Sequence, residues 1–446
     1  MRRRHLPLHR GPALLALALV GPPACARTGA PAPEPASSLI VGARLIDGTG
    51  APARPAAVRI AGDRIAAVGD LAPRAGERVV DAAGLVLAPG FIDTHSHHGG
   101  GLREHPDALG AVSQGITTVV SGADGGSRHP LGEWLRELEY APVAVNVASF
   151  AGHGTLRRRV MGDDYRRAAT PDEVDAMARL LRLDLDAGAL GLSTGLEYDP
   201  GIYATTEEVI ALARVAAEAG GRYSSHIRSE DRRLFDAVDE AIRIGREAGI
   251  PVQISHLKLA MRSLWGRADE LLARLDSARA AGVDVTADVY PYTFWQSTMT
   301  VLFPDRDFDD RDAAAFALDE LAPPGGMRIA RYEPDPSYEG RTLAEVAAIR
   351  GEDPVTSYMA LIARARAENA EESIIATSMD ENDIVTLLRW PHTNVGSDGG
   401  LDGAHPRGFG AFTRVLGPYV RSGHLRLEQA VYKMTGLAAR HLGIAE

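Results

Sequence analysis

The feature that most constrains the fold of this 446-residue chain is a series of eight short apolar runs separated by helical stretches. The runs begin near Phe91, Thr117, Val143, Ala189, Arg222, Val252, Val283 and Thr393. Strands that alternate with helices form parallel β/α units, because a parallel neighbour is reached only through a crossover connection. Eight such units predict a TIM-type (β/α)8 barrel, an α/β fold whose chemistry lies at the carboxyl ends of the strands.

Two further segments accompany the barrel. Residues 39–88 contain short β runs with turns, which predict a small antiparallel β module before a barrel of residues 89–446. A long insertion at about residues 294–392 separates the seventh and eighth strands, and we expect it to form a subdomain or lid over the barrel mouth. Helical runs are expected at Arg341–Arg350, Pro354–Asn369 and, at the end of the chain, Arg426–Leu442.

Residues 1–25 have the order of a secretion signal: a positive start at Arg2–Arg10, an apolar run at Ala13–Val20, then small residues. That apolar run is too short to span a bilayer. The single cysteine, Cys25, lies at its exit and predicts either a lipid anchor of the bacterial lipoprotein type or removal with the signal. Residues 26–38 are rich in Pro and Ala and predict an extended tether. We therefore expect an exported bacterial protein, periplasmic or anchored to a membrane.

The charge balance excludes one class of partner. The chain has 59 acidic and 48 basic residues, a formal charge of −11, and no dense basic tract after the first ten residues. Nucleic acid is therefore not expected as a partner. The expected partner is a small-molecule substrate. Because Cys25 is the single cysteine, no internal disulfide and no thiolate metal ligand are expected in the mature chain.

The run Phe-Ile-Asp-Thr-His-Ser-His, which ends at His97, indicates a metal site. His95 and His97 are two residues apart, so on a strand both imidazoles leave the same face. Two nitrogen ligands at a rigid strand end make half of a divalent-metal site. His98 breaks the alternation and is not expected to be a ligand.

Four more residues at strand ends complete the expected metal centre. His226 and His256 end consecutive strands and form a second nitrogen pair, although each alone could be a buried core histidine. Asp124 ends the second strand, where it is either a carboxylate ligand or a turn residue before two glycines. Asp398 ends the eighth strand. We expect it to be both a metal ligand and the general base that takes a proton from an activated water.

Cationic and hydroxyl groups near the same strand ends predict a substrate with a carboxylate. Lys258, Arg228, Tyr290 and Tyr292 are the expected contacts, and the alternative for the two cations is a salt bridge on the loops. Two other residues at strand ends are expected only to position loops or ligands: Glu197 and His153.

With these motifs the chain resembles the N-acyl-D-amino-acid deacylases, or D-aminoacylases, of the amidohydrolase superfamily, from about Leu39 to its end. Distinctive stretches include Gly-His-Gly-Thr-Leu-Arg, Gly-Leu-Ser-Thr-Gly-Leu-Glu-Tyr-Asp-Pro-Gly, Asp-Val-Tyr-Pro-Tyr-Thr and His-Pro-Arg. The resemblance implies a zinc hydrolase that releases a D-amino acid from its N-acyl derivative. It implies a tight metal site and a second, weaker one, with Lys258 and Tyr290 on the substrate α-carboxylate. The tight site would comprise Asp124, His226 and His256, and the weaker site His95, His97 and Asp398.

The chain departs from the family pattern in two places. Well-known family members carry cysteine where this chain has Asp124, and an oxygen ligand is harder than a thiolate. They also continue into strands that complete the β module, so either a smaller module or a truncated chain is expected here. The alternatives are a dipeptidase or cyclic amidase with the same chemistry, and a surface-anchored binding protein without turnover. Lys258 and Tyr290 argue against a cyclic amide, and Asp398 argues against the binding protein.

Overall fold

The computed structural model describes residues 37–444, which belong to two compact units. The described part of the first unit comprises residues 37–42 and 56–83 and forms a four-stranded sheet in the order β5-β4-β1-β6. Its strands are β1 (Ser37–Val41), β4 (Ala57–Ala61), β5 (Arg64–Gly69) and β6 (Arg78–Asp81). β1 thus begins two residues before the expected boundary at Leu39. The expected signal and nearly all of the expected tether lie outside the described residues.

The sheet of the first unit contains the expected antiparallel pairs and, in addition, one parallel pair that was not expected. β4 pairs antiparallel with both β1 and β5, whereas β6 pairs parallel with β1. The chain after β5 crosses to the far edge of the sheet and enters β6 in the direction of β1. Leu39 and Val58 supply its buried apolar side chains. The parallel pairing joins residues about 40 positions apart, and the local sequence pattern does not reveal it.

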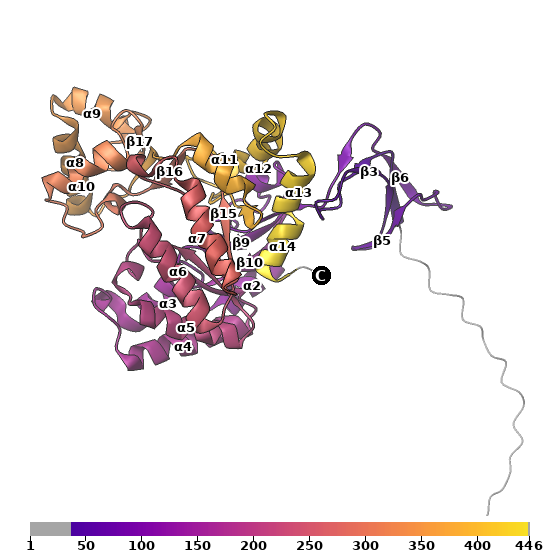
Figure 1. The fold of residues 1–446 in the computed structure, drawn as a ribbon, viewed down its shortest axis with the longest axis horizontal. Coiled ribbons are helices and arrows are strands. Elements are labelled where there is room, and N and C mark those ends of the chain that lie inside the picture. Colours follow the sequence, from indigo (N-terminus) through magenta and orange to yellow (C-terminus); the bar gives the residue numbers. More distant parts are fainter. Residues whose placement is uncertain (1–36, 445–446) are drawn as a thin grey trace, which may run out of the picture. The chain divides into compact units, whose positions relative to one another are not determined.

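The second unit contains the barrel (Figure 1). A small sheet of β2 (Arg44–Leu45), β3 (Arg54–Pro55) and β7 (Val86–Leu87) precedes it. The barrel strands are β8 (Phe91–Asp93), β9 (Ile116–Ser121), β10 (Asn146–Ser149) continued by β11 (Ala151–Gly152), β12 (Gly191–Gly195), β13 (Arg222–His226), β14 (Val252–Ile254), β15 (Val285–Val289) and β19 (Thr393–Val395). Neighbouring strands pair in parallel throughout, as expected for a (β/α)8 barrel.

Residues just beyond the first and last barrel strands close the barrel. Ser96 and Gly399 form a parallel bridge. The His97 amide donates to the Gly399 carbonyl at 2.8 Å, and the Asp398 amide donates to the His95 carbonyl at 2.8 Å. The backbone of three expected metal ligands therefore forms the seam that joins β8 to β19.

Helices on the outside complete the β/α units, and α4, α5 and α6 lie side by side there (Figure 1). The helices of the barrel are α1 (Leu109–Val112), α2 (Leu131–Tyr140), α3 (His153–Met161), α4 (Pro171–Asp186), α5 (Thr206–Glu218), α6 (Leu234–Ala248), α7 (Ala268–Ala280), α11 (Glu381–Arg389), α12 (Arg407–Arg414), α13 (Leu427–Met434) and α14 (Gly436–Leu442). The start of α4 follows from its sequence: Thr170 and Glu173 form a capping box, and Pro171 occupies the first turn. The expectation of a single final helix at Arg426–Leu442 was wrong. The backbone leaves the helical region at Thr435, which divides this segment into α13 and α14.

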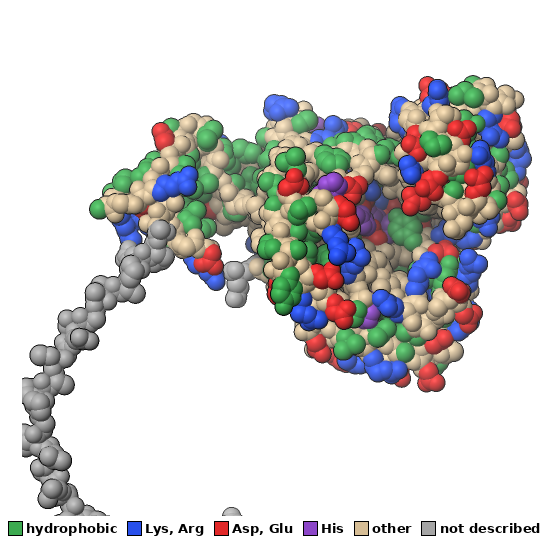
Figure 2. Space-filling view, turned by 180° about the vertical axis from the view of Figure 1, so that it is seen from behind, with side chains coloured by type: hydrophobic (Ala, Val, Ile, Leu, Met, Phe, Trp, Pro, Cys, Tyr) green, Lys and Arg blue, Asp and Glu red, His purple; other side chains and the backbone are tan. Residues whose placement is uncertain are grey.

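The insertion between β15 and β19 is a subdomain with its own antiparallel sheet, in the order β16-β18-β17. Its elements are β16 (Phe294–Ser297), α8 (Arg311–Phe316), a π-helical turn (Ala317–Leu321), β17 (Met327–Tyr332), α9 (Leu343–Arg350), α10 (Pro354–Glu368) and β18 (Glu372–Thr377). The subdomain ends earlier than the expected residue 392, because α11 packs against α7, β15 and β19 and so belongs to the barrel. Figure 2 shows a hollow beside this subdomain in which histidine and hydrophobic side chains lie next to one another.

In the range 37–444, no helix combines the length and the apolar character that crossing a membrane requires.

Candidate metal and substrate site

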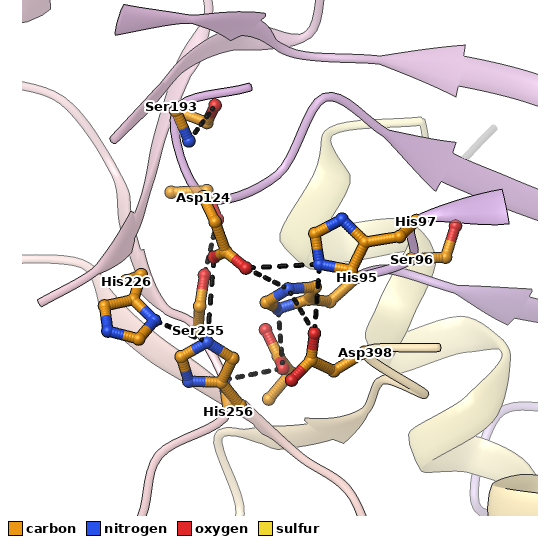
Figure 3. Close-up of polar contacts among 12 residues, drawn as sticks. His95, Ser96, His97, Asp124, Ser193, His226, Ser255, His256 and Asp398 are labelled. Atoms are coloured by element: carbon orange, nitrogen blue, oxygen red, sulfur yellow. Dashed lines mark hydrogen bonds and ion pairs between the residues drawn. The ribbon is translucent and has the colours of Figure 1, made fainter. Parts of the chain in front are cut away.

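The six expected metal ligands lie together at the carboxyl ends of the barrel strands (Figure 3). His95 and His97 follow β8, Asp124 follows β9, and Asp398 follows β19. His226 is the last residue of β13, and His256 comes two residues after β14. Residues far apart in the sequence meet here because the carboxyl ends of parallel strands share one end of the barrel.

Three of these residues have left-handed backbone conformations. Asp124, His256 and Asp398 have φ values of 53°, 37° and 49°. In this region an L-residue crowds its own Cβ, at a cost on the order of 1–3 kcal/mol per residue. The conformation bends the chain sharply just after the strand, and each of the three side chains lines the same cavity. Strain concentrated in this way is typical of functional sites.

One group of donors surrounds the His95–His97 pair. Asp124 Oδ2 lies 3.2 Å from His95 Nε2 and 3.3 Å from His97 Nε2. Asp398 Oδ1 lies 3.1 Å from His97 Nε2 and 3.5 Å from His95 Nε2. The four donor atoms are all within 4.8 Å of one another. His98, as expected, lies outside this group.

A second group shares Asp124 with the first (Figure 3). Its other carboxylate oxygen, Oδ1, lies 3.7 Å from His256 Nε2. His226 Nδ1 lies 2.9 Å from His256 Nε2, and the other ring nitrogen of His226 lies 2.8 Å from Glu197 Oε2. Glu197 thus orients a candidate ligand, in line with the positioning role expected for it.

Electrostatics among these residues match a cation site. Burial opposes a charged His95, but the carboxylates of Asp124, Asp288 and Asp398 outweigh it and raise the pKa of His95 well above its usual value. Burial likewise opposes the charge of Asp124, but His95 and His256 hold the pKa of this carboxyl well below its usual range.

The donor set fits a divalent metal. Asp124 Oδ1 is buried without a hydrogen-bond partner although His256 Nε2 lies 3.7 Å away. An acceptor left in that state is costly, and a cation between the groups satisfies it. Imidazole nitrogens and carboxylate oxygens are the ligands found at catalytic zinc sites.

Asp288 supports the site and was missed at the level of sequence. It is fully buried on β15, with Oδ1 accepting from the His256 amide at 2.8 Å and lying 3.2 Å from His95 Nδ1. At this distance the Asp288 carboxylate is one of the charges that raise the pKa of the candidate ligand His95. The alternation of side chains along a strand could have identified Asp288, because residues two apart share a face and Tyr290 follows it by two.

A cavity of about 330 Å³ opens from the donor groups, and two of the four expected substrate contacts line it. Lys258 Nζ donates to Glu230 Oε1 at 2.5 Å. The Tyr290 hydroxyl is buried and has no hydrogen-bond partner. Arg407 also lines the cavity and pairs with Asp398 at 2.6 Å, a role missed in the sequence although the motif His-Pro-Arg contains it.

The other two expected substrate contacts are elsewhere, so those assignments are corrected. Arg228 makes a paired contact with Glu240, at 2.8 and 2.9 Å, and does not line the cavity. This is the salt bridge considered as its alternative. Tyr292 also lies outside the lining and packs its ring edge-on against His405. His153 is buried against Glu208 at 2.8 Å, away from the site.

A larger cavity, of about 1360 Å³, is lined by none of the expected site residues. Its lining includes Asp284 and Thr286 at the start of β15 and His392 just before β19. It therefore lies at the amino ends of these strands, opposite the end where barrel chemistry occurs.

Comparison with known proteins agrees with this geometry. The profile of the amidohydrolase family matches residues 78–321. An N-acyl-D-glutamate deacylase of Alcaligenes xylosoxydans xylosoxydans is 41% identical over 433 residues, covering 92% of this chain and 83% of the relative. A D-aminoacylase of the same organism is 39% identical, covering 92% and 85%. The crystal structure of an N-acyl-D-glutamate deacylase from Bordetella bronchiseptica, complexed with zinc and a phosphonate mimic of the tetrahedral intermediate, superposes with a TM-score of 0.82 at 37% identity, covering 92% of this chain and 87% of that one.

Proposed function

This chain belongs to the amidohydrolase family, in its N-acyl-D-amino-acid deacylase branch, and we propose that it hydrolyses the amide bond of N-acyl-D-amino acids. Water adds to the amide carbon, the C–N bond breaks, and a carboxylate and a D-amino acid leave. The observation that carries the proposal is the convergence of six metal-binding side chains at one end of a cavity that also holds an ammonium group and an unpartnered phenol.

Zinc is the proposed cofactor. Asp124, His226 and His256 would hold one ion, and His95, His97 and Asp398 would hold a second. A bound zinc ion supplies polarisation of a carbonyl oxygen and acidification of a water molecule. The two carboxylate oxygens of Asp124 face the two groups separately, which allows this residue to serve both.

Asp398 is the proposed general base. Its carboxylate lies at the cavity wall and is held by Arg407 at 2.6 Å, which fixes its orientation. Asp398 accepts a proton from the attacking water and returns it to the departing amine nitrogen, so that the leaving group is neutral. A general base in this position contributes a rate factor of roughly 10² to 10⁴.

Lys258 and Tyr290 bind the substrate α-carboxylate. The ammonium group of Lys258 lies 5.8 Å from the centre of the Tyr290 ring, so both groups serve one part of the cavity. The buried hydroxyl of Tyr290 needs an acceptor, and a substrate carboxylate supplies one. A free α-carboxylate distinguishes a linear N-acyl amino acid from a cyclic amide.

The test is hydrolysis of N-acetyl-D-amino acids by the purified protein, before and after zinc is removed and restored. We expect turnover with D-substrates that is lost with the metal and regained with zinc. N-acetyl-L-amino acids, dipeptides and cyclic amides are the controls. Preference for one of these, or no turnover with any substrate at full metal content, would contradict the proposal.

We also propose that the protein is exported and that Cys25 is either lipidated or removed with the signal. The support is the order of positive, apolar and small residues in the first 25 positions.

A further inference from the structure

The lining of the substrate cavity addresses a property that family membership leaves open, namely which amino-acid side chain is accepted. Relatives of similar identity are named for D-glutamate and for D-amino acids in general. We infer that this enzyme takes N-acyl-D-amino acids with uncharged, apolar side chains, such as D-leucine, D-methionine and D-phenylalanine, and rejects acidic ones. This inference rests on the proposed function, because it assigns the amino-acid half of that substrate.

The amino-acid half occupies the cavity that contains Lys258 and Tyr290. These residues hold the α-carboxylate, and the side chain branches from the carbon next to it, so the side chain must share this cavity. The acyl half lies across the scissile amide. A second cavity of about 380 Å³ shares five lining residues with the first: His97, Gln296, Ser297, Asp398 and Arg407. The rest of its lining consists of His405 and of glycine, serine and threonine residues.

Apolar side chains make up much of the lining of the first cavity beyond the metal ligands. They are Ala260, Trp295, Val301, Leu302 and Leu321, and Gln296 and Ser297 follow Trp295 in the same lining. Leu302 and Leu321 are buried, at 8% and 3% exposure. The indole nitrogen of Trp295 donates to Ser378 Oγ at 2.5 Å, so this donor is already occupied. An apolar substrate side chain placed against this wall leaves water, which favours binding.

The charges of the cavity exclude a second carboxylate. Apart from the candidate metal ligands Asp124 and Asp398, three carboxylates line it: Glu197, Glu230 and Asp231. Two cationic side chains of the described chain also line it: Lys258, which contacts Glu230 at 2.5 Å and serves the α-carboxylate in the proposed function, and Arg407, which pairs with Asp398 at 2.6 Å. An acidic substrate side chain would lose its hydration beside these carboxylates, with neither cation left to pair with it.

The first experiment measures kcat/KM of the zinc-loaded wild-type protein for N-acetyl derivatives of D-leucine, D-methionine, D-glutamate and D-aspartate. We expect the two apolar substrates to exceed the two acidic ones by about 100-fold or more, because an unpaired buried carboxylate is rejected strongly. Equal or higher values for D-glutamate or D-aspartate would overturn the inference and leave the proposed function standing.

The second experiment places a cation in the apolar wall. Val301 is half-buried and precedes Leu302 in the lining. Val301→Arg should raise the ratio of kcat/KM for N-acetyl-D-glutamate over N-acetyl-D-leucine by at least about tenfold. Val301→Met is the matched control, since it adds length without charge and should leave the ratio within about twofold of wild type. An unchanged ratio in a folded, zinc-loaded Val301→Arg protein counts against the assigned wall.

A binding measurement separates this inference from the proposed function. Calorimetric titration of wild-type protein with the products D-leucine and D-glutamate requires no turnover. Tighter binding of D-leucine, by about tenfold or more, supports the apolar site, and this result does not depend on hydrolysis. Failure to hydrolyse any of the four substrates refutes the deacylase activity alone. Tighter binding of D-glutamate contradicts the inference in either case.

Discussion

Asp398 combines three roles in one residue: its amide closes the barrel, its carboxylate faces two histidines, and the same carboxylate pairs with Arg407. Asp398→Asn keeps the shape and one oxygen donor but cannot accept a proton. We expect turnover to fall by a factor of roughly 10² to 10⁴, with little change in KM. The measurement is steady-state hydrolysis of an N-acetyl-D-amino acid at matched metal content. Comparable turnover in the two proteins would remove Asp398 as the base.

Asp124 is the residue through which the two donor groups meet. Asp124→Ala removes both oxygens, and we expect it to lose most of the bound metal. Asp124→Cys supplies one sulfur that can serve as a metal ligand, so it should keep at least part of the metal that Asp124→Ala loses. Elemental analysis of the purified proteins after dialysis gives the stoichiometry without an activity assay. Full metal content in Asp124→Ala would show that this aspartate only completes a turn.

At this scale the strand ends were the useful signal in the sequence. The six candidate ligands, Lys258 and Tyr290 were all proposed from strand ends, and the structure places them together at one end of the barrel. Arg228 and Tyr292 were proposed on the same grounds, but Arg228 pairs with Glu240 and Tyr292 packs against His405. Distance from the strand does not separate the two outcomes, because Asp398 also lies three residues beyond its strand, and the direction of a side chain on such a loop depends on a path that strand alternation does not give. Arg407 was missed because its partner, Asp398, is reached through a loop whose path the sequence pattern does not give.

Among the elements, the subdomain between β15 and β19 contains a half-buried carboxylate outside the site. Glu372, the first residue of β18, accepts from the Met299 amide at 2.8 Å. Burial raises the pKa of Glu372 to about 7, against the opposing hydrogen bonds from the Met299 and Thr300 amides. The folded protein therefore binds this proton more tightly than the unfolded chain does. Its stabilisation is fully present below about pH 4.5 and is lost as the pH rises through 7.

We expect Glu372→Gln to be more stable than wild type at pH 8, by about 2–4 kcal/mol if the full pKa shift is expressed, and to approach wild type near pH 5. The neutral amide keeps an oxygen acceptor for the Met299 amide but does not ionise. Urea denaturation at pH 5, 6, 7 and 8 measures the difference. Glu371→Gln is the control, since Glu371 is the exposed neighbour in sequence. A constant difference between Glu372→Gln and wild type across this range would contradict the assignment.

The subdomain also supplies most of the apolar cavity wall, through Trp295, Val301, Leu302 and Leu321. The candidate metal ligands lie at the ends of barrel strands or just beyond them. In the proposed assignment, chemistry and side-chain choice therefore lie on different elements, so substitutions in the subdomain are expected to change specificity without touching a ligand. The sequence predicted the insertion but not its extent, since α11 has the composition of any amphipathic helix and only its packing assigns it to the barrel.

At the scale of the whole molecule we predict export, which depends on residues outside the described range. Expressed in a Gram-negative host, the full-length protein should be found in the periplasmic or membrane fraction. Cys25→Ser should move it from membrane to soluble periplasm if the cysteine is lipidated, and should change nothing if it is removed with the signal. Cell fractionation with immunodetection is the measurement. Full-length wild-type protein retained in the cytosol would refute the proposal.

A ribosome delivers His97 long before Asp398, because the two residues are 301 positions apart. At about 5–20 residues per second, this interval lasts roughly 15–60 s. Until β19 arrives, the histidines lack the Asp398 carboxylate, the seam is open, and the proposed base is absent. The nascent chain is therefore expected to be inactive until late in its synthesis. The onset of hydrolysis in a translation reaction would then report the closing of the barrel.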